Sequence, residues 1–101
     1  MKQYNKLVRD KITEIIQAKG EPFTAHTANE QEYWVKLKEK LVEEAEEFIK
    51  NESIDELADI FEVVDAICAY KQFDKNDLAR IKEKKRLERG GFDKRIILEE
   101  A

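Results

Sequence analysis

The sequence predicts an all-α fold, and three observations lead to that prediction. Apolar residues recur every three or four positions through most of the chain, which is the period of an amphipathic helix. Three segments begin at residues that cap helix N-termini well, and the 101 residues include only three glycines and one proline. Charged and hydrophobic residues each make up 42% of the chain, which suits helices with one apolar and one solvated face. We therefore expect a single helical domain over residues 1–101, built from four helices.

The first helix is expected near residues 5–19. Leu7, Ile12 and Ile16 recur there at helical spacing. Gly20 and Pro22 follow, and both residues disfavour continuation of a helix.

Two segments outside the helices have β character. Residues 23–27 are partly alternating and rich in threonine, which suits either a strand or an extended loop. Ile96–Leu98 is an apolar run near the C-terminus. We expect a small two-stranded antiparallel ribbon, about residues 22–27 with 93–98, beside the helices.

The second helix is expected at about residues 30–50. Asn29 precedes it as an N-cap, and Glu32 stands three positions later, which is the spacing of a capping box. Leu37 and Leu41 lie on its apolar stripe.

The third helix has the same start signal, because Ser53 is followed three positions later by Glu56. It is expected to end near Gln72, and its apolar residues extend around most of its circumference. Such a helix lies at the centre of a bundle or at a subunit interface.

The fourth helix, about residues 76–89, is expected to start after a cap at Asp74 or Asn76. Gly90 follows its last residue and suits a left-handed C-cap. The helix is polar and strongly basic on most of its surface.

Charge is distributed unevenly along the chain, whose net charge is −4. Residues 43–65 hold ten acids and one base, whereas residues 80–95 hold eight bases and three acids. One half is suited to a cation and the other to an anion. This arrangement fits a metal ion and a phosphorylated ligand better than nucleic acid, for which the whole domain should be basic.

Several classes of protein are disfavoured by the composition. Cys68 is the only cysteine and lies in an apolar run, so we expect a buried thiol and no disulfide framework. The N-terminal residues lack the apolar stretch of a signal peptide, and no segment approaches membrane-spanning length. We therefore expect a cytoplasmic protein that does not bind a membrane.

Two pairs of carboxylates are the main candidate site: Glu44 with Glu47, and Glu56 with Asp59. Residues three apart share one side of a helix, and two antiparallel helices can bring both pairs to one point. Hard divalent cations prefer such oxygen ligands, often alongside substrate phosphates. The sequence therefore indicates a Mg²⁺ site, with Mn²⁺ as an alternative ion.

The first pair also has an ordinary structural interpretation. A run of acids such as Glu43–Glu47 is typical of a solvated helix face. On a helical wheel, Glu44 and Glu47 approach the apolar stripe, whereas Glu43 and Glu46 point away from it.

The two residues of the second pair, Glu56 and Asp59, differ in whether an ordinary structural role explains them. Glu56 can bond back to the amide of the Ser53 cap. Asp59 lies on a largely apolar flank, so its charge needs a basic partner or a metal ion. His26 is the only histidine and is expected on the surface, which disfavours zinc and di-iron sites.

The simplest interpretation of the basic residues between positions 80 and 95 is ordinary surface charge, favourably placed near the C-terminal end of a helix. If the two pairs of carboxylates hold a metal ion, these basic residues become candidates for binding phosphate. Lys6 and Arg9, about one helical turn apart, are candidates for binding the same phosphates.

Three motifs in order resemble the MazG-like, all-α nucleoside triphosphate pyrophosphohydrolases: Lys40-Leu-Val-Glu-Glu-Ala-Glu-Glu47, Glu56-Leu-Ala-Asp-Ile60 and Lys85-Arg-Leu-Glu-Arg89. The opening Tyr4-Asn-Lys-Leu-Val-Arg-Asp-Lys-Ile12 looks like a subgroup labelled phosphoribosyl-ATP pyrophosphohydrolase-like. The resemblance spans most of the chain and implies a four-helix MazG-like bundle. It also implies that four acids are Mg²⁺ ligands: Glu44, Glu47, Glu56 and Asp59. Lys85 and Arg89 are implied to contact the phosphates.

The implied reaction is Mg²⁺-dependent hydrolysis of a nucleoside triphosphate, or a similar phosphoanhydride, with release of pyrophosphate, in a house-cleaning role. Glu47, as a carboxylate that metal does not fully engage, would orient or deprotonate the attacking water. Lys85 and Arg89, with Lys6 or Arg9, would offset charge on the leaving pyrophosphate. The resemblance and the apolar third helix together imply a homodimer or homotetramer.

Two other function classes stay open. A non-catalytic helical interaction module would use the same acids as solvated or capping residues and would dock a partner on the third helix. Nucleic-acid binding through residues 80–95 would give steep salt dependence of affinity. The net charge of −4 makes this the least favoured class.

Overall fold

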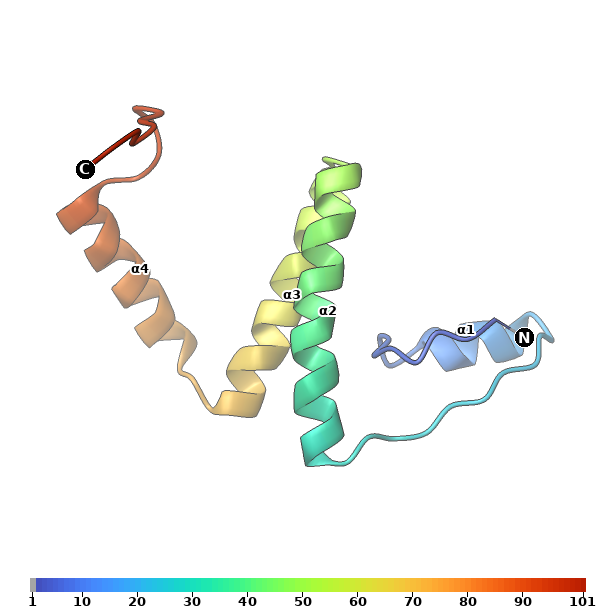
Figure 1. The fold of residues 1–101 in the computed structure, drawn as a ribbon. Helices are drawn as coiled ribbons and strands as arrows, with labels where there is room; N and C mark the ends of the chain where they lie inside the picture. Colours follow the sequence, from blue (N-terminus) through green and yellow to red (C-terminus); the bar gives the residue numbers. More distant parts are fainter. Residues whose placement is uncertain (1) are drawn as a thin grey trace.

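The computed structural model describes residues 2–101, and that part of the chain is all-helical. Its helices are α1 (Ile12–Ala18), α2 (Glu30–Lys50), α3 (Ile54–Lys71) and α4 (Lys75–Arg89) (Figure 1). The predicted fold class and the extents of the second, third and fourth helices are therefore confirmed, to within one residue at most ends. None of the helices in residues 2–101 is long and apolar enough to cross a membrane.

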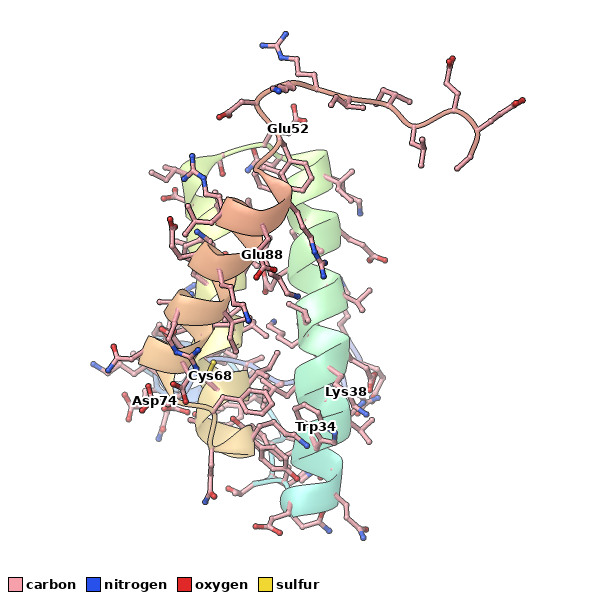
Figure 2. The ribbon with its side chains drawn as sticks, turned by 90° about the vertical axis from the view of Figure 1, so that its left-hand side faces the viewer. Trp34, Lys38, Glu52, Cys68, Asp74 and Glu88 are labelled. Atoms are coloured by element: carbon pink, nitrogen blue, oxygen red, sulfur yellow. The ribbon has the colours of Figure 1, made fainter. Side chains whose placement is uncertain are left out.

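The centre of the molecule is an antiparallel pair formed by α2 and α3 (Figure 1). Leu37 of α2 is only 1% exposed, and Val63 and Cys68 of α3 are also buried, which confirms the expected buried thiol. At one end of the pair, the rings of Trp34 and Tyr70 stack with their centroids 4.9 Å apart. Figure 2 shows Trp34 and Cys68 in the same half of this pair.

Side-chain caps start these helices where the sequence predicts. The side chain of Asn29 accepts a hydrogen bond from the Glu32 amide at 2.9 Å, and Ser53 accepts one from the Glu56 amide at 3.3 Å. Asp74 caps α4 in the same way. Each cap satisfies an amide that has no partner inside its helix, and this fixes the helix start.

The compact bundle implied by the family resemblance does not form within one chain. α1 lies to one side of the central pair and α4 diverges on the other side (Figure 1). The radius of gyration is 17.8 Å, against about 13 Å for a compact domain of this length. Every residue from 71 to 101 is exposed, so α4 is not covered by any other described part of the chain.

The first helix is shorter than predicted, because it begins at Ile12 rather than near residue 5. Residues 2–11 instead form an irregular segment that we call the N-terminal arm. Asn5 has φ +48°, which interrupts a right-handed helix, and its carbonyl accepts a hydrogen bond from Lys36 at 2.8 Å. Contacts with α2 therefore override the helical pattern of the arm.

The predicted ribbon of residues 22–27 with 93–98 is wrong, because neither segment is a strand in the structure. The first segment lies in the connection between α1 and α2, and the second follows α4 on the opposite side of the molecule (Figure 1). A strand needs a neighbour to satisfy its backbone hydrogen bonds. The divergence of α4 separates the two segments and leaves both irregular.

Candidate metal centre

Three carboxylates converge between α2 and α3: those of Glu44, Glu56 and Asp59. One oxygen from each lies within 4.8 Å of the other two. The predicted convergence of acids from two antiparallel helices is thus observed for three of the four residues.

The helical period places these acids on the packed faces. Glu44 follows the buried Leu37 by seven residues, or two turns, and is itself only 9% exposed. On α3, Glu56 and Asp59 precede the buried Val63 by seven and four residues. The acids therefore continue the two apolar stripes that hold the helices together.

Glu44 has one cationic neighbour on its own helix. Lys40 Nζ lies 3.3 Å from Glu44 Oε1 and 3.1 Å from Glu43 Oε2. The Lys40 and Glu44 side chains are only 15% and 12% exposed, so this ion pair is shielded from water. A shielded carboxylate needs such compensation because burial of an unpaired charge is costly.

Asp59 is paired with the N-terminal arm across 50 positions of sequence. Arg9 Nη2 donates a hydrogen bond to Asp59 Oδ1 at 2.7 Å, and Arg9 Nη1 lies 3.6 Å from Glu62 Oε1. The expectation that Asp59 needs a basic partner or a metal ion is met here by Arg9.

The arm also binds Glu43, which does not point away as the helical wheel predicted. Lys6 Nζ donates a hydrogen bond to Glu43 Oε1 at 2.8 Å. This hydrogen bond raises the pKa of Lys6, against the opposite effect of burial. Burial raises the pKa of Glu43, but hydrogen bonds from Lys6 and Lys40 outweigh it, so the pKa lies below its ordinary value.

The donor set fits a hard divalent cation. All three converging groups are carboxylates, and oxygen ligands are those that Mg²⁺ and Mn²⁺ prefer. Two ligands about 2.1 Å from Mg²⁺ lie about 3.0 Å apart in cis positions and about 4.2 Å apart in trans positions. The observed limit of 4.8 Å is somewhat longer than the trans separation, so the three oxygens would move closer together on binding one ion.

The local charge also favours a cation. The carboxylates around the site are Glu43, Glu44, Glu56, Asp59 and Glu62, and the cations paired with them are Lys6, Arg9 and Lys40. Carboxylates therefore outnumber the cations that contact them. Close like charges repel, and a divalent ion would relieve that repulsion.

The remaining predicted site residues are not at this point of convergence. Glu47 lies on α2 with an exposed side chain and is not one of the three converging residues. Lys85 and Arg89 lie on α4, which diverges from the central pair (Figure 1). Within one chain, the structure therefore separates the predicted phosphate-binding helix from the acids.

Two features of the site were not predicted from the sequence. Lys40 was not among the candidate site residues, although its spacing of four from Glu44 on one helix is a detectable signal. The contact of Arg9 with Asp59 has no such signal, because the arm is irregular. His26 is exposed, as predicted, and its Nε2 lies 2.9 Å from Glu32 Oε1.

Comparison of the chain with protein-family models, curated proteins and solved structures gave no match.

Proposed function

We propose that this chain is a Mg²⁺-dependent pyrophosphohydrolase that acts on a nucleoside triphosphate or a related phosphoanhydride, with Mn²⁺ as an alternative ion. The observation that carries the proposal is the convergence of Glu44, Glu56 and Asp59 within 4.8 Å on two packed helices. The motif resemblance supplies the reaction type. A bound Mg²⁺ would neutralise phosphate oxygens and make a water molecule at the site a stronger acid.

Different residues of the chain would hold the ion and activate the attacking water. Glu44, Glu56 and Asp59 would hold the ion, with Glu44 fixed by its burial and by Lys40. Glu47 lies one turn after Glu44, and its exposed carboxylate is suited to orient or deprotonate the attacking water. In this assignment Glu47 acts as a base and not as a principal ligand.

Cations would stabilise the charge that develops on the leaving pyrophosphate. Lys6 and Arg9 already lie beside the acids, because the arm is bound to Glu43 and Asp59. Lys85 and Arg89 would reach the same phosphates only from a differently placed α4. A second copy of the chain could provide such an α4.

We propose a homo-oligomer, a dimer or tetramer, in which a second copy covers the exposed apolar side chains of α3 and α4. Phe61 of α3 is 65% exposed, and Leu78 and Ile81 of α4 are each 44% exposed. An uncovered helix of 15 residues is only marginally stable in water. The basic α4 of one copy also complements the acidic α2 and α3 of another.

The alternative is a non-catalytic helical interaction module. It is favoured by the same exposed apolar side chains, which a different protein could cover instead of a second copy. In that case the ion pairs of Lys40 and Arg9 would be the whole explanation of the acids. The two functions differ in whether the chain binds Mg²⁺ and turns over a nucleotide.

The direct test is pyrophosphate release from canonical and modified nucleoside triphosphates, measured with Mg²⁺ and with EDTA. The informative variant is Asp59→Asn, which removes a ligand charge with almost no change in shape. Asp65→Asn is the matched control, because Asp65 lies on the same helix but pairs with Lys75 at 3.2 Å. We expect metal-dependent release by the wild type and Asp65→Asn, and a loss of about a hundredfold in Asp59→Asn.

If no triphosphate is cleaved, phosphoribosyl-ATP and other phosphoanhydrides are the next substrates to test. Calorimetry with Mg²⁺ then separates the two functions. No turnover of any of these compounds, together with no Mg²⁺ binding, would contradict the hydrolase and favour the interaction module.

A further inference from the structure

The N-terminal arm is irregular, yet polar contacts fasten it to both central helices. Lys36 of α2 holds the Asn5 carbonyl at 2.8 Å, and Lys6 donates to Glu43 of α2 at 2.8 Å. Arg9 donates to Asp59 of α3 at 2.7 Å. These three contacts join residues between 31 and 50 positions apart in the sequence. The arm therefore bridges α2 and α3 beside the three converging carboxylates of Glu44, Glu56 and Asp59, which we call the acidic group.

Arg9 is the arm residue that touches the acidic group itself. Its guanidinium occupies one oxygen of Asp59 and extends toward Glu62 at 3.6 Å. A guanidinium and a divalent cation are both attracted to the same carboxylate and repel each other. A divalent ion at Asp59 would therefore be repelled by Arg9 for as long as the guanidinium stays on that carboxylate.

The Arg9 contact is also the kind that can open. The Arg9 side chain is 54% exposed and that of Asp59 is 38% exposed, unlike the shielded pair of Lys40 and Glu44. Exposed ion pairs contribute little to stability, and solvent replaces the lost partner readily. Arg9 can thus leave Asp59 without disturbing the packing of α2 against α3.

We propose that the N-terminal arm is a latch on the acidic group, in which Arg9 and a divalent cation compete for Asp59. Arg9 holds the carboxylate while the site is empty, and it gives up Asp59 when the ion binds. The freed guanidinium then lies beside the site, where it is available to an anionic substrate. This inference rests on the proposed function only in its requirement that the acids bind a divalent ion.

Competition has a measurable sign, because loss of the competitor tightens binding of the ion. Calorimetric titration of Mg²⁺ into the full-length protein should give about twofold to fivefold tighter binding for Arg9→Gln than for the wild type, the factor expected for an exposed ion pair. Lys11→Gln is the control. It removes the same charge from the same arm, at a residue with no ion pair in the described chain.

A second measurement follows the arm itself. In nuclear magnetic resonance spectra of the full-length protein, Mg²⁺ should move the arm amide signals toward their positions in metal-free Arg9→Gln. The signals of that variant should respond much less to the ion. Asp59→Asn should show the signals of an arm whose Arg9 is free, with or without Mg²⁺, while Lys6 and Asn5 keep their contacts with α2.

The latch is overturned if Arg9→Gln binds Mg²⁺ no more tightly than Lys11→Gln, or if bound Mg²⁺ leaves the arm signals of the wild type unchanged. Weaker binding by Arg9→Gln would instead make Arg9 a residue that orients Asp59. Neither measurement uses turnover, so a protein that binds Mg²⁺ but cleaves no phosphoanhydride would refute the hydrolase and leave the latch intact. Absence of Mg²⁺ binding in both the wild type and Arg9→Gln would refute both.

Discussion

Helices α2 and α4 have similar local signals and different surroundings. Each begins at a side-chain cap, Asn29 for α2 and Asp74 for α4, and both have charged residues on most of their surface. α2 buries Leu37 and Glu44 against α3, whereas α4 buries no residue. The comparison shows that caps and helical propensity define where a helix begins and ends, while matching apolar faces decide what it packs against.

The largest expected effect on stability is in the packed pair. Leu37→Ala should lower the free energy of unfolding by about 2–5 kcal/mol, because it removes the most buried side chain and leaves a cavity. Chemical denaturation followed by circular dichroism measures the change. Val42→Ala on the same helix is the control, since Val42 is 58% exposed, and it should change stability by no more than about 0.5 kcal/mol. Equal losses in the two variants would mean that α2 does not pack as described.

The next effect concerns the uncovered helix. Ile81→Asp should weaken self-association at least tenfold, because burial of an isoleucine contributes about 1.5–3 kcal/mol. Ile81→Met keeps an apolar side chain of similar size and should associate like the wild type. Sedimentation velocity over a range of concentrations measures both. A wild type that stays monomeric throughout would contradict the proposed oligomer and leave the exposed face of α4 to another partner.

A smaller effect is expected where the cap alone is removed. Asn29→Ala should cost about 1 kcal/mol, because the Glu32 amide loses its hydrogen-bond acceptor at the start of α2. Thermal unfolding compares this variant with Asn29→Ser, which retains a capping oxygen and should lose much less. If serine and alanine are equally destabilising, the cap at Asn29 does not contribute as the structure indicates.

The smallest expected effect is the pH-dependent contribution of the ion pair between Lys6 and Glu43. The folded pKa of Glu43 lies below its ordinary value of 4.5, so its contribution is present above that value and lost as pH falls through the folded pKa. The folded pKa of Lys6 lies above its ordinary value of 10.5, so its contribution is complete below that value and lost as pH rises through the folded pKa.

Lys6→Gln should therefore be less stable than the wild type between about pH 5 and pH 10, by less than about 1 kcal/mol because the pair is partly exposed. The difference should decline as pH falls through the folded pKa of Glu43, which lies below 4.5. Denaturation of both proteins at several pH values measures it, with Lys11→Gln as the control for loss of charge from the arm. A stability difference that is independent of pH would assign the effect to a cause other than this pair.

Local signals explain what could be predicted of the fold. Asn29, Ser53 and Asp74 fix three helix starts through hydrogen bonds within three residues, so the sequence alone is sufficient to place them. The arm could not be predicted in this way. The helical spacing of Leu7 with Ile12 does not extend the helix into the arm, whose contacts are with residues more than 30 positions away, which no local pattern encodes.

The candidate site likewise has parts that local sequence patterns indicate and parts that they do not. Glu44 was recognisable because it continues the apolar stripe of α2, and Asp59 because its charge lies on an apolar flank. The position of α4 was not recognisable, because α4 buries no residue, so no matching apolar faces in the sequence indicate where it lies. Three of the four predicted acids therefore converge, while Glu47 does not join them and Lys85 and Arg89 do not approach them within the chain.

The proposed metal centre is tested most directly by nuclear magnetic resonance with substoichiometric Mn²⁺, whose unpaired electrons broaden the signals of nearby amides. We expect the amides around Glu44, Glu56 and Asp59 to broaden first, and Glu44→Gln to abolish this selectivity. Broadening spread evenly over the exposed acids, including Glu46 and Glu52, would contradict a specific metal site between α2 and α3.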